Sequence, residues 1–201
     1  MTVDGFEVAF QTNHLSHFLL TKLLMSNLES SAPSRVVVVS SSLHQGRGKG
    51  TLQPDLKTSS LDELRKSWSD NPNGMVLYKS SKLANILFAF ELNRRLKDRR
   101  VTCNALSPGF IPNTGLSRNQ GLFGIFFMKY VMAILPFKFI ATLEQGATCI
   151  EYVATAEELE GIGGNYYAAC KEAPTSELAK SEELQSSLWR LSESMIAPYV
   201  R

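Results

Sequence analysis

Apolar side chains recur three and four positions apart along much of this chain, which is the spacing of one face of a helix. The clearest case is the segment 5–28, where Phe6, Phe10, Phe18 and Leu23 share this spacing. The same pattern predicts further helices at residues 61–68, 78–96, 143–155 and 176–196. The polar, glycine-rich stretch from 40 to 74 contains only the short helix 61–68, so we expect a long surface excursion there.

Two short apolar runs predict buried strands at residues 36–39 and 101–106, and residues 165–169 are expected to be extended. Helix, strand, helix and strand in this order predict an α/β fold, a Rossmann-like, doubly wound parallel sheet in one domain over residues 1–201. The all-valine run 36–39 predicts a central strand. Ligands of such sheets bind beyond the carboxyl ends of the strands, so both strand ends should carry the chemistry.

Charge and cysteine content narrow the choice of partners. The 21 basic and 19 acidic residues give a net charge of only +2 and are spread along the chain, so we expect no nucleic-acid partner. The three cysteines, Cys103, Cys149 and Cys170, are far apart in sequence and include no CxxC pair. We therefore expect reduced thiols in an intracellular protein, either cytoplasmic or peripherally associated with a membrane. No targeting signal is visible at the N-terminus.

Residues 122–141 are rich in Phe, Ile, Leu and Met and are about as long as a membrane span. Lys129, Pro136 and Lys138 interrupt the segment, so a true span is disfavoured. We expect it to cover an apolar pocket, with peripheral membrane contact as the alternative.

Tyr78 and Lys82 are four positions apart on a predicted helix, so they share one face. A tyrosine with its ordinary pKa of about 10 is a poor acid or base at neutral pH, and a nearby ammonium is expected to lower that pKa. A solvated lysine beside a half-buried tyrosine would have the same spacing, so the pair needs support from its surroundings.

Both predicted strands end in residues suited to a ligand site. Ser40, Ser41 and Ser42 follow the first strand, and a serine hydroxyl there can donate to a substrate carbonyl oxygen. Pro108 and Gly109 follow the second strand, where glycine allows backbone to approach a flat ligand. Each segment could also be an ordinary polar turn.

Four motifs stand in a fixed order along the chain, namely Asn13-His14-Leu15, Val39-Ser40-Ser41, Tyr78-xxx-Lys82 and Pro108-Gly109. Together they resemble the short-chain dehydrogenase/reductase family over nearly the whole chain. Residues 13–18, 35–37, 78–85 and 159–166 are similar to the branch that contains retinol dehydrogenases and the WW-domain oxidoreductase. Residues 114–116 resemble the more distant protochlorophyllide reductases.

This resemblance implies four catalytic residues. Tyr78 would be the general acid/base, and Lys82 would tune it and hold the nicotinamide ribose. Ser41, rather than Ser40 or Ser42, would hydrogen-bond the substrate oxygen. Asn13 would hold a water in the proton relay toward the lysine.

The resemblance also implies a cofactor-binding segment after the second strand. Pro108, Gly109 and the backbone at Ile111 would contact the nicotinamide, and Asn113 or Thr114 would contact the phosphates. The family also uses a GxxxGxG turn to seat the cofactor pyrophosphate, and no such turn precedes Asn13. We therefore expect an N-terminally truncated domain, its C-terminal catalytic part, that binds NADP(H) poorly by itself.

The resemblance favours NADP(H), with NAD(H) as the other candidate, and a small apolar alcohol, aldehyde or ketone of retinoid, steroid or lipid type. A catalytically silent truncated isoform that acts as a binding or regulatory protein is the alternative, and a protochlorophyllide reductase-like enzyme is a more remote one. A homo-oligomer is left open. His14 and His17 share a helix face, but no third ligand with metal spacing accompanies them, so no metal site is expected.

Overall fold

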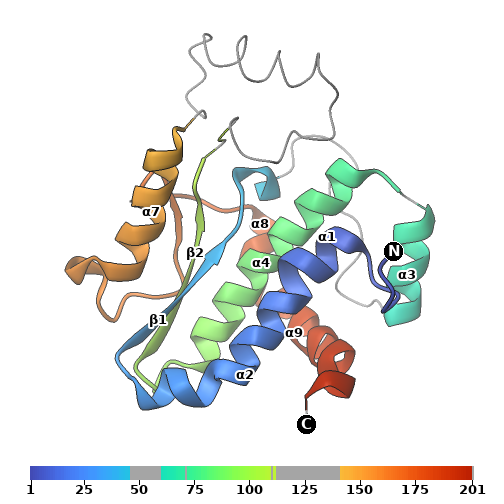
Figure 1. Ribbon diagram of the computed structural model, residues 1–201, viewed down its shortest axis with the longest axis horizontal. Helices are drawn as coiled ribbons and strands as arrows, with labels where there is room; N and C mark the ends of the chain where they lie inside the picture. Colours follow the sequence, from blue (N-terminus) through green and yellow to red (C-terminus); the bar gives the residue numbers. More distant parts are fainter. Residues whose placement is uncertain (46–59, 71, 110, 112–140, 201) are drawn as a thin grey trace.

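The computed structural model describes residues 1–45, 60–70, 72–109, 111 and 141–200. The elements of these ranges, in chain order, are α1 (Val8–Phe10), η1 (Gln11–Leu15), α2 (Ser16–Ser30), β1 (Ser34–Val39), η2 (Ser42–Gln45), α3 (Leu61–Asp70), α4 (Gly74–Arg95), β2 (Val101–Ser107), α7 (Leu143–Thr155), η5 (Glu157–Leu159), β3 (Tyr166–Ala168), β4 (Lys171–Glu172), α8 (Glu177–Lys180), α9 (Glu182–Ile196) and η6 (Ala197–Tyr199). Figure 1 shows them along the chain.

The sheet has the strand order β1-β2-β3-β4, with β1, β2 and β3 parallel and β4 antiparallel to β3. Successive residues of a strand point to opposite faces, and the two faces have separate cores. Cys103 and Ala105 of β2 join the larger core with α2, α4 and α9, whereas Leu106 joins the smaller core with Val153 of α7. Helices thus cover both faces, with α4 and α7 on opposite sides (Figure 1), and the predicted doubly wound parallel α/β sheet is confirmed.

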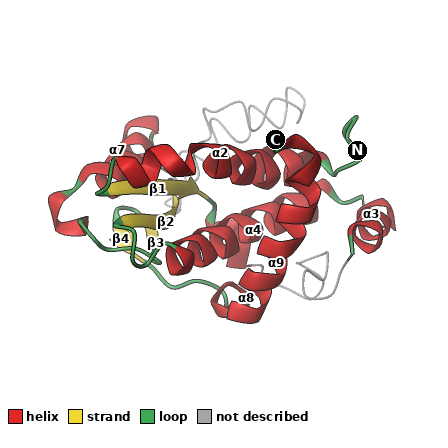
Figure 2. Ribbon diagram, turned by 90° about the horizontal axis from the view of Figure 1, so that it is seen from below, coloured by secondary structure: helices red, strands yellow, loops and turns green. Residues whose placement is uncertain are grey.

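Helix α4 is the central element of the larger core. The Asn73 side chain caps its N-terminus by accepting from the backbone N–H groups of Met75 and Val76. From Ser80 to Ala89 every residue is buried, because the sheet, α1 and α9 pack around the helix. Figure 2 shows α4 between the sheet and α9. Trp68 and Trp189 are buried against aromatic neighbours, as expected of packing residues.

Several predicted elements differ from those observed. The first predicted helix contains the π-helical turn η1, and the last one is divided at Ser181, whose side chain caps α9. The hairpin strand β4 was not predicted. Strand β1 lies at the end of the described strand order, and only Val38 of it is buried, so in the described sheet the run 36–39 has a neighbouring strand on one side only.

Two predicted segments lie outside the described residues. They are the glycine-rich loop around residue 48 and nearly all of 122–141, so the pocket cover and the membrane contact stay predictions. Within the described ranges, no helix has the length and apolar character needed to cross a membrane.

A close backbone approach at Gly163 joins the β3 side of the sheet to α4. A Cβ at this position would lie 2.0 Å from the Asn93 Oδ1 atom and 3.0 Å from the Thr102 Cβ atom. Asn93 cannot move aside without cost, because its Oδ1 accepts the Cys103 N–H at 3.0 Å.

We expect Gly163→Ala to lower the free energy of unfolding by about 1 to 3 kcal/mol through overpacking. Gly74→Ala is the matched control, since a Cβ there meets no heavy atom within 4 Å, and it should leave stability unchanged or raise it by up to about 1 kcal/mol. Urea unfolding followed by tryptophan fluorescence measures both. Equal stability of the two variants would contradict the close approach.

Candidate active site

The carboxyl end of β1 and the middle of α4 are joined by hydrogen bonds in both directions. The Ser40 hydroxyl donates to the Lys82 carbonyl at 2.7 Å, while the Lys82 ammonium and the Asn85 amide both donate to the Val39 carbonyl at 3.1 Å. These contacts are largely buried. They fix the height of α4 relative to the strand end, and with it the position of Tyr78 one turn earlier.

Ser40 and Ser41 point in different directions, as neighbouring residues at a strand end do. The Ser40 hydroxyl is only 3% exposed and is used in the contact with α4. The Ser41 hydroxyl lies next to the Tyr78 phenol and accepts the Leu43 N–H at 3.2 Å. The structure thus brings Ser41, and not Ser40, to the tyrosine.

Lys82 lies below the Tyr78 ring, with its ammonium nitrogen 5.8 Å from the ring centroid. Burial raises the pKa of Tyr78 above its ordinary value, and the Ser41 hydroxyl offsets only part of that rise. The lowered pKa expected from the Tyr–Lys spacing is therefore wrong for this arrangement. The physical reason is that Tyr78 is itself desolvated by burial, which disfavours its charged phenolate, while the Lys82 ammonium donates to the Val39 carbonyl. Burial also lowers the pKa of Lys82.

Asn13 lies in the π-helical turn η1, a distortion that occurs often at functional sites. Its side-chain amide donates to the Ser81 hydroxyl at 3.0 Å, and Ser81 in turn donates to the Tyr78 carbonyl at 2.7 Å. Asn13 thus contacts the helical turn between Tyr78 and Lys82. Its role in holding a water remains a prediction.

The segment after β2 passes close to α7. Gly109 has a φ of +89°, a conformation that favours glycine. A Cβ at Gly146 of α7 would lie 2.5 Å from Ile111 Cδ1 and 3.3 Å from the Pro108 carbonyl oxygen, so the helix and this segment are in direct contact. Asn113 and Thr114, the expected phosphate ligands, lie outside the described residues.

His44 lies in the turn η2, and its ring is fully buried. Its Nε2 accepts the Ser176 N–H at 3.3 Å, so a neutral ring must carry its proton on Nδ1, which lies 2.7 Å from the Ser41 carbonyl oxygen. Burial lowers the pKa of His44, which favours this neutral form. The His44 ring therefore holds the Ser41 backbone through the Ser41 carbonyl oxygen. The sequence did not indicate this role.

His14 and His17 have different surroundings. His14 is fully buried, with its Nε2 2.8 Å from the Ser192 hydroxyl, and His17 is exposed, with its Nδ1 2.7 Å from the Asn13 carbonyl oxygen. Among the described residues, no group of three or more His, Cys, Asp or Glu side chains could hold a metal ion.

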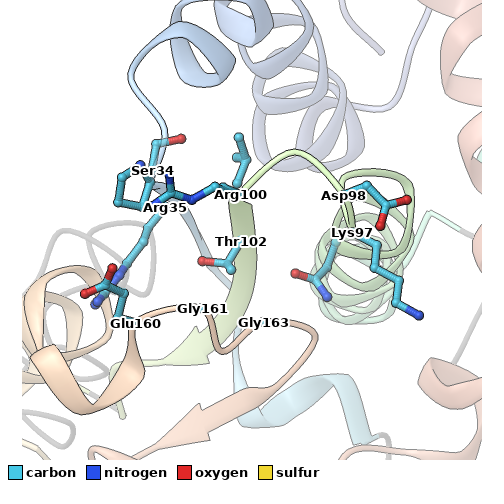
Figure 3. Close-up of a pocket in the computed structure, with 12 residues that line it drawn as sticks. Ser34, Arg35, Lys97, Asp98, Arg100, Thr102, Glu160, Gly161 and Gly163 are labelled. Carbon is cyan, nitrogen blue, oxygen red and sulfur yellow. The ribbon is translucent and has the colours of Figure 1, made fainter.

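A polar pocket of about 370 Å³ lies at the opposite edge of the sheet, beside the amino ends of β1 and β2. Arg35, Thr102 and Glu160 line it, and Figure 3 shows them around the Gly161–Gly163 turn. None of the residues predicted from the sequence lines this pocket. The candidate active site is therefore the strand-end group of Ser41, Tyr78 and Lys82.

The residues present fit a nicotinamide cofactor at its ribose and nicotinamide end. An ammonium has three donors, and Lys82 uses one of them on Val39 within the described part of the chain. The buried Asn85 Oδ1 has no hydrogen-bond partner among the described residues, and Gly109 presents backbone without a side chain. Lys82 and Asn85, on the helix that carries Tyr78, thus retain donor and acceptor capacity that the described residues do not use.

A parallel sheet covered by helices on both faces, with serine after strand β1 and with tyrosine and lysine on helix α4, is the arrangement expected of a short-chain dehydrogenase/reductase type of protein. Over 97% or more of its length the chain is similar to proteins named as retinol dehydrogenases and a WW domain-containing oxidoreductase, which are short-chain dehydrogenases/reductases. It is 40% identical to retinol dehydrogenase 14 of Homo sapiens over 195 residues, which are 97% of this chain and 54% of that protein. It is also 40% identical to the WW domain-containing oxidoreductase of Homo sapiens over 197 residues, 98% of this chain and 45% of that protein.

One similar solved structure is that of an uncharacterized protein from Mycobacterium paratuberculosis, with a TM-score of 0.63 and 28% sequence identity. The match covers 98% of this chain and 61% of that one. No family model matches the chain. The chain spans about half the length of the curated relatives it matches.

Proposed function

We propose that this chain carries the catalytic residues of a nicotinamide-dependent oxidoreductase that interconverts an apolar alcohol and its aldehyde or ketone. The observation that supports this most directly is the meeting of Ser41, Tyr78 and Lys82 at the carboxyl end of β1. The relatives named as retinol dehydrogenases favour a retinoid-like substrate, with steroid and lipid carbonyls as alternatives. We favour NADP(H) over NAD(H) by family resemblance.

Each residue has a part in moving a proton to the substrate oxygen. Tyr78, whose pKa is raised by burial, is protonated at neutral pH and can donate its phenolic proton to a carbonyl oxygen in reduction. The Ser41 hydroxyl, beside it, can donate a hydrogen bond to the same oxygen and stabilise the charge that develops there. The nicotinamide cofactor supplies or accepts the hydride when bound. Lys82 and the backbone from Pro108 to Ile111 would hold its ribose and nicotinamide.

The test is NADPH-dependent reduction of retinaldehyde, a steroid ketone and a medium-chain aldehyde by the longest protein that contains this sequence. We expect saturable turnover of at least one of them, faster with NADPH than with NADH. Absence of turnover with either cofactor would contradict the proposed function.

The alternative is a catalytically silent binding or regulatory protein, and one observation favours it for the 201-residue chain itself. The sequence contains no GxxxGxG turn, so a cofactor would lack this seat for its pyrophosphate, and the remaining contacts would be too few to offset the entropy of association. We expect titration of the 201-residue chain with NADPH to show weak binding and almost no turnover. Tight, saturable binding by a monomer would contradict this expectation.

The two neighbouring serines should respond differently to replacement by alanine. Ser41→Ala removes the group that faces Tyr78, so kcat/KM should fall by about 10² to 10³ with little change in stability. Ser40→Ala removes the buried hydrogen bond to Lys82 and should lower the free energy of unfolding by about 1 kcal/mol. Steady-state kinetics and urea unfolding of both variants separate the two roles. If both variants lost the same kcat/KM and had the same free energy of unfolding, the assignment of different roles to the two serines would be contradicted.

A further inference from the structure

Cys149 and Cys170, which are 21 residues apart in sequence, meet between α7 and the β3–β4 hairpin. The Cys170 N–H donates to the Cys149 sulfur at 3.1 Å. Because N and Cα are about 1.5 Å apart, the Cys170 Cα lies within roughly 4.6 Å of that sulfur. The side chains of the two thiols also interact with each other. Two cysteines in this relation can be bridged without moving the backbone far.

The backbone conformation of the β3–β4 hairpin is a second observation that points to a function for the contact between Cys149 and Cys170. Ala169 and Cys170 form the two-residue loop between β3 and β4, and both have positive φ angles, of 50° and 58°. Such loops favour Asn-Gly, because other residues adopt this conformation only with strain. A strained turn retained by its surroundings points to a functional constraint. Here the turn directs the Cys170 N–H at the Cys149 sulfur.

We propose that Cys149 and Cys170 form a reversible disulfide by exchange with glutathione disulfide. The Cys170 thiolate attacks one sulfur of glutathione disulfide, which forms a mixed disulfide and releases one glutathione thiolate. Cys149 then passes its proton to the released glutathione thiolate, and the resulting Cys149 thiolate attacks the Cys170 sulfur and displaces the second glutathione. Two S–H bonds of the protein are replaced by one S–S bond, and glutathione disulfide takes up two electrons and both protons as two glutathione molecules.

The order of attack follows from burial. Cys149 is 1% exposed, and burial raises its pKa to about 11, so it remains a thiol at neutral pH. Cys170 is partly exposed and therefore meets the reagent first. Cys103, on β2, is fully buried with a raised pKa, and it serves as an internal control.

The disulfide would connect two parts of the fold that meet near the candidate active site. Gly146 lies one turn before Cys149 on α7 and packs on Pro108 and Ile111. The crosslink would join α7, which packs on Pro108 and Ile111, to the β3–β4 hairpin. Helix α7 would then have less freedom to move relative to the segment that follows β2.

The test is to incubate the reduced 201-residue chain with glutathione disulfide, block remaining thiols with N-ethylmaleimide, digest without reductant and identify the products by mass spectrometry. We expect the Cys149–Cys170 peptide to exceed any disulfide that contains Cys103 by about tenfold or more, since the pair is preorganised. Added glutathione should reverse it. The same treatment in concentrated urea should remove the preference.

Two variants sharpen the result. Cys149→Ser should leave Cys170 as a stable mixed disulfide with glutathione, because the resolving thiol is gone, whereas Cys103→Ser should form the crosslink as the parent does. The proposal is overturned if the parent accumulates singly glutathionylated Cys170 without the crosslink. It is equally overturned if both cysteines remain reduced, or if Cys103 enters disulfides as readily as the pair.

Discussion

Tyr78→Phe should lower kcat/KM for reduction of an apolar aldehyde by about 10² to 10⁴, the usual contribution of a general acid. The phenyl ring still packs over Lys82, so affinity for NADPH should change little. The substitution removes only the phenolic hydroxyl with its transferable proton. Steady-state kinetics and NADPH titration of the longest protein that contains this chain measure both effects.

The matched control is Tyr199→Phe, which removes the same hydroxyl from an exposed tyrosine that contacts Asp4, far along the chain from the site. It should leave the kinetics unchanged. Turnover of Tyr78→Phe within about threefold of the parent would mean that another group transfers the proton.

Acid should destabilise this protein through His14. The ring is fully buried among Phe10, Phe18 and Phe88, and its Nδ1 has no hydrogen-bond partner in the described structure. Burial lowers the pKa of His14 from 6.5 to about 3. The unfolded chain therefore takes up a proton at a higher pH than the folded chain does.

Because the folded chain binds this proton less readily than the unfolded chain, lowering the pH favours unfolding. The stability that the neutral ring provides is complete well above pH 6.5 and is lost as the pH falls from about 6.5 toward 3, by up to about 1.4 kcal/mol per pH unit. Between neutral pH and pH 4.5 the loss should amount to about 2 to 3 kcal/mol. His44, whose pKa is also lowered by burial, acts in the same direction.

Urea unfolding at a series of pH values measures this slope. His14→Leu removes the titrating group, so its stability should depend much less on pH over the same interval, whatever its stability at neutral pH. His17→Leu, at an exposed position one turn later, should reduce the slope only slightly, because the His17 charge is the smaller cause of the lowered His14 pKa. An unchanged slope in His14→Leu would place the acid sensitivity elsewhere.

The sequence predicted best those elements whose packing gives a regular pattern. The helix 143–155 has the predicted bounds because it faces the sheet along one side, and Thr142 and Gln145 form a capping box at its start. The strand predicted at 101–106 is observed at Val101–Ser107, and it is buried along most of its length. Helix α4 began four residues earlier than predicted, at an asparagine cap whose effect is local rather than periodic.

Features that depend on contacts between distant residues could not be predicted. The π-helical turn at Gln11–Leu15 contains neither proline nor glycine, so its sequence looks like ordinary helix. The burial of His44 depends on Ser176 and Tyr166, which are more than 100 positions away. The cysteine pair was missed for the same reason, because spacing along the chain says nothing about α7 and the hairpin meeting in space.

The candidate site was predicted as a set of residues but not as a geometry. Family resemblance chose Ser41 over Ser40, and the structure supplies the physical basis, since the two hydroxyls leave the strand in opposite directions. The pKa of Tyr78 was predicted with the wrong sign because the Tyr–Lys spacing indicates proximity to an ammonium but not the burial of the phenol, which depends on the whole fold.

The reciprocal contacts of Val39 and Ser40 with Lys82 hold the end of β1 and helix α4 in one register. Side chains and backbone carbonyls both alternate along a strand, so inserting one residue within β1 would move Ser40 toward the place of Ser41 and turn the Val39 carbonyl away from Lys82. The contacts that anchor the helix therefore also determine which serine lies beside Tyr78.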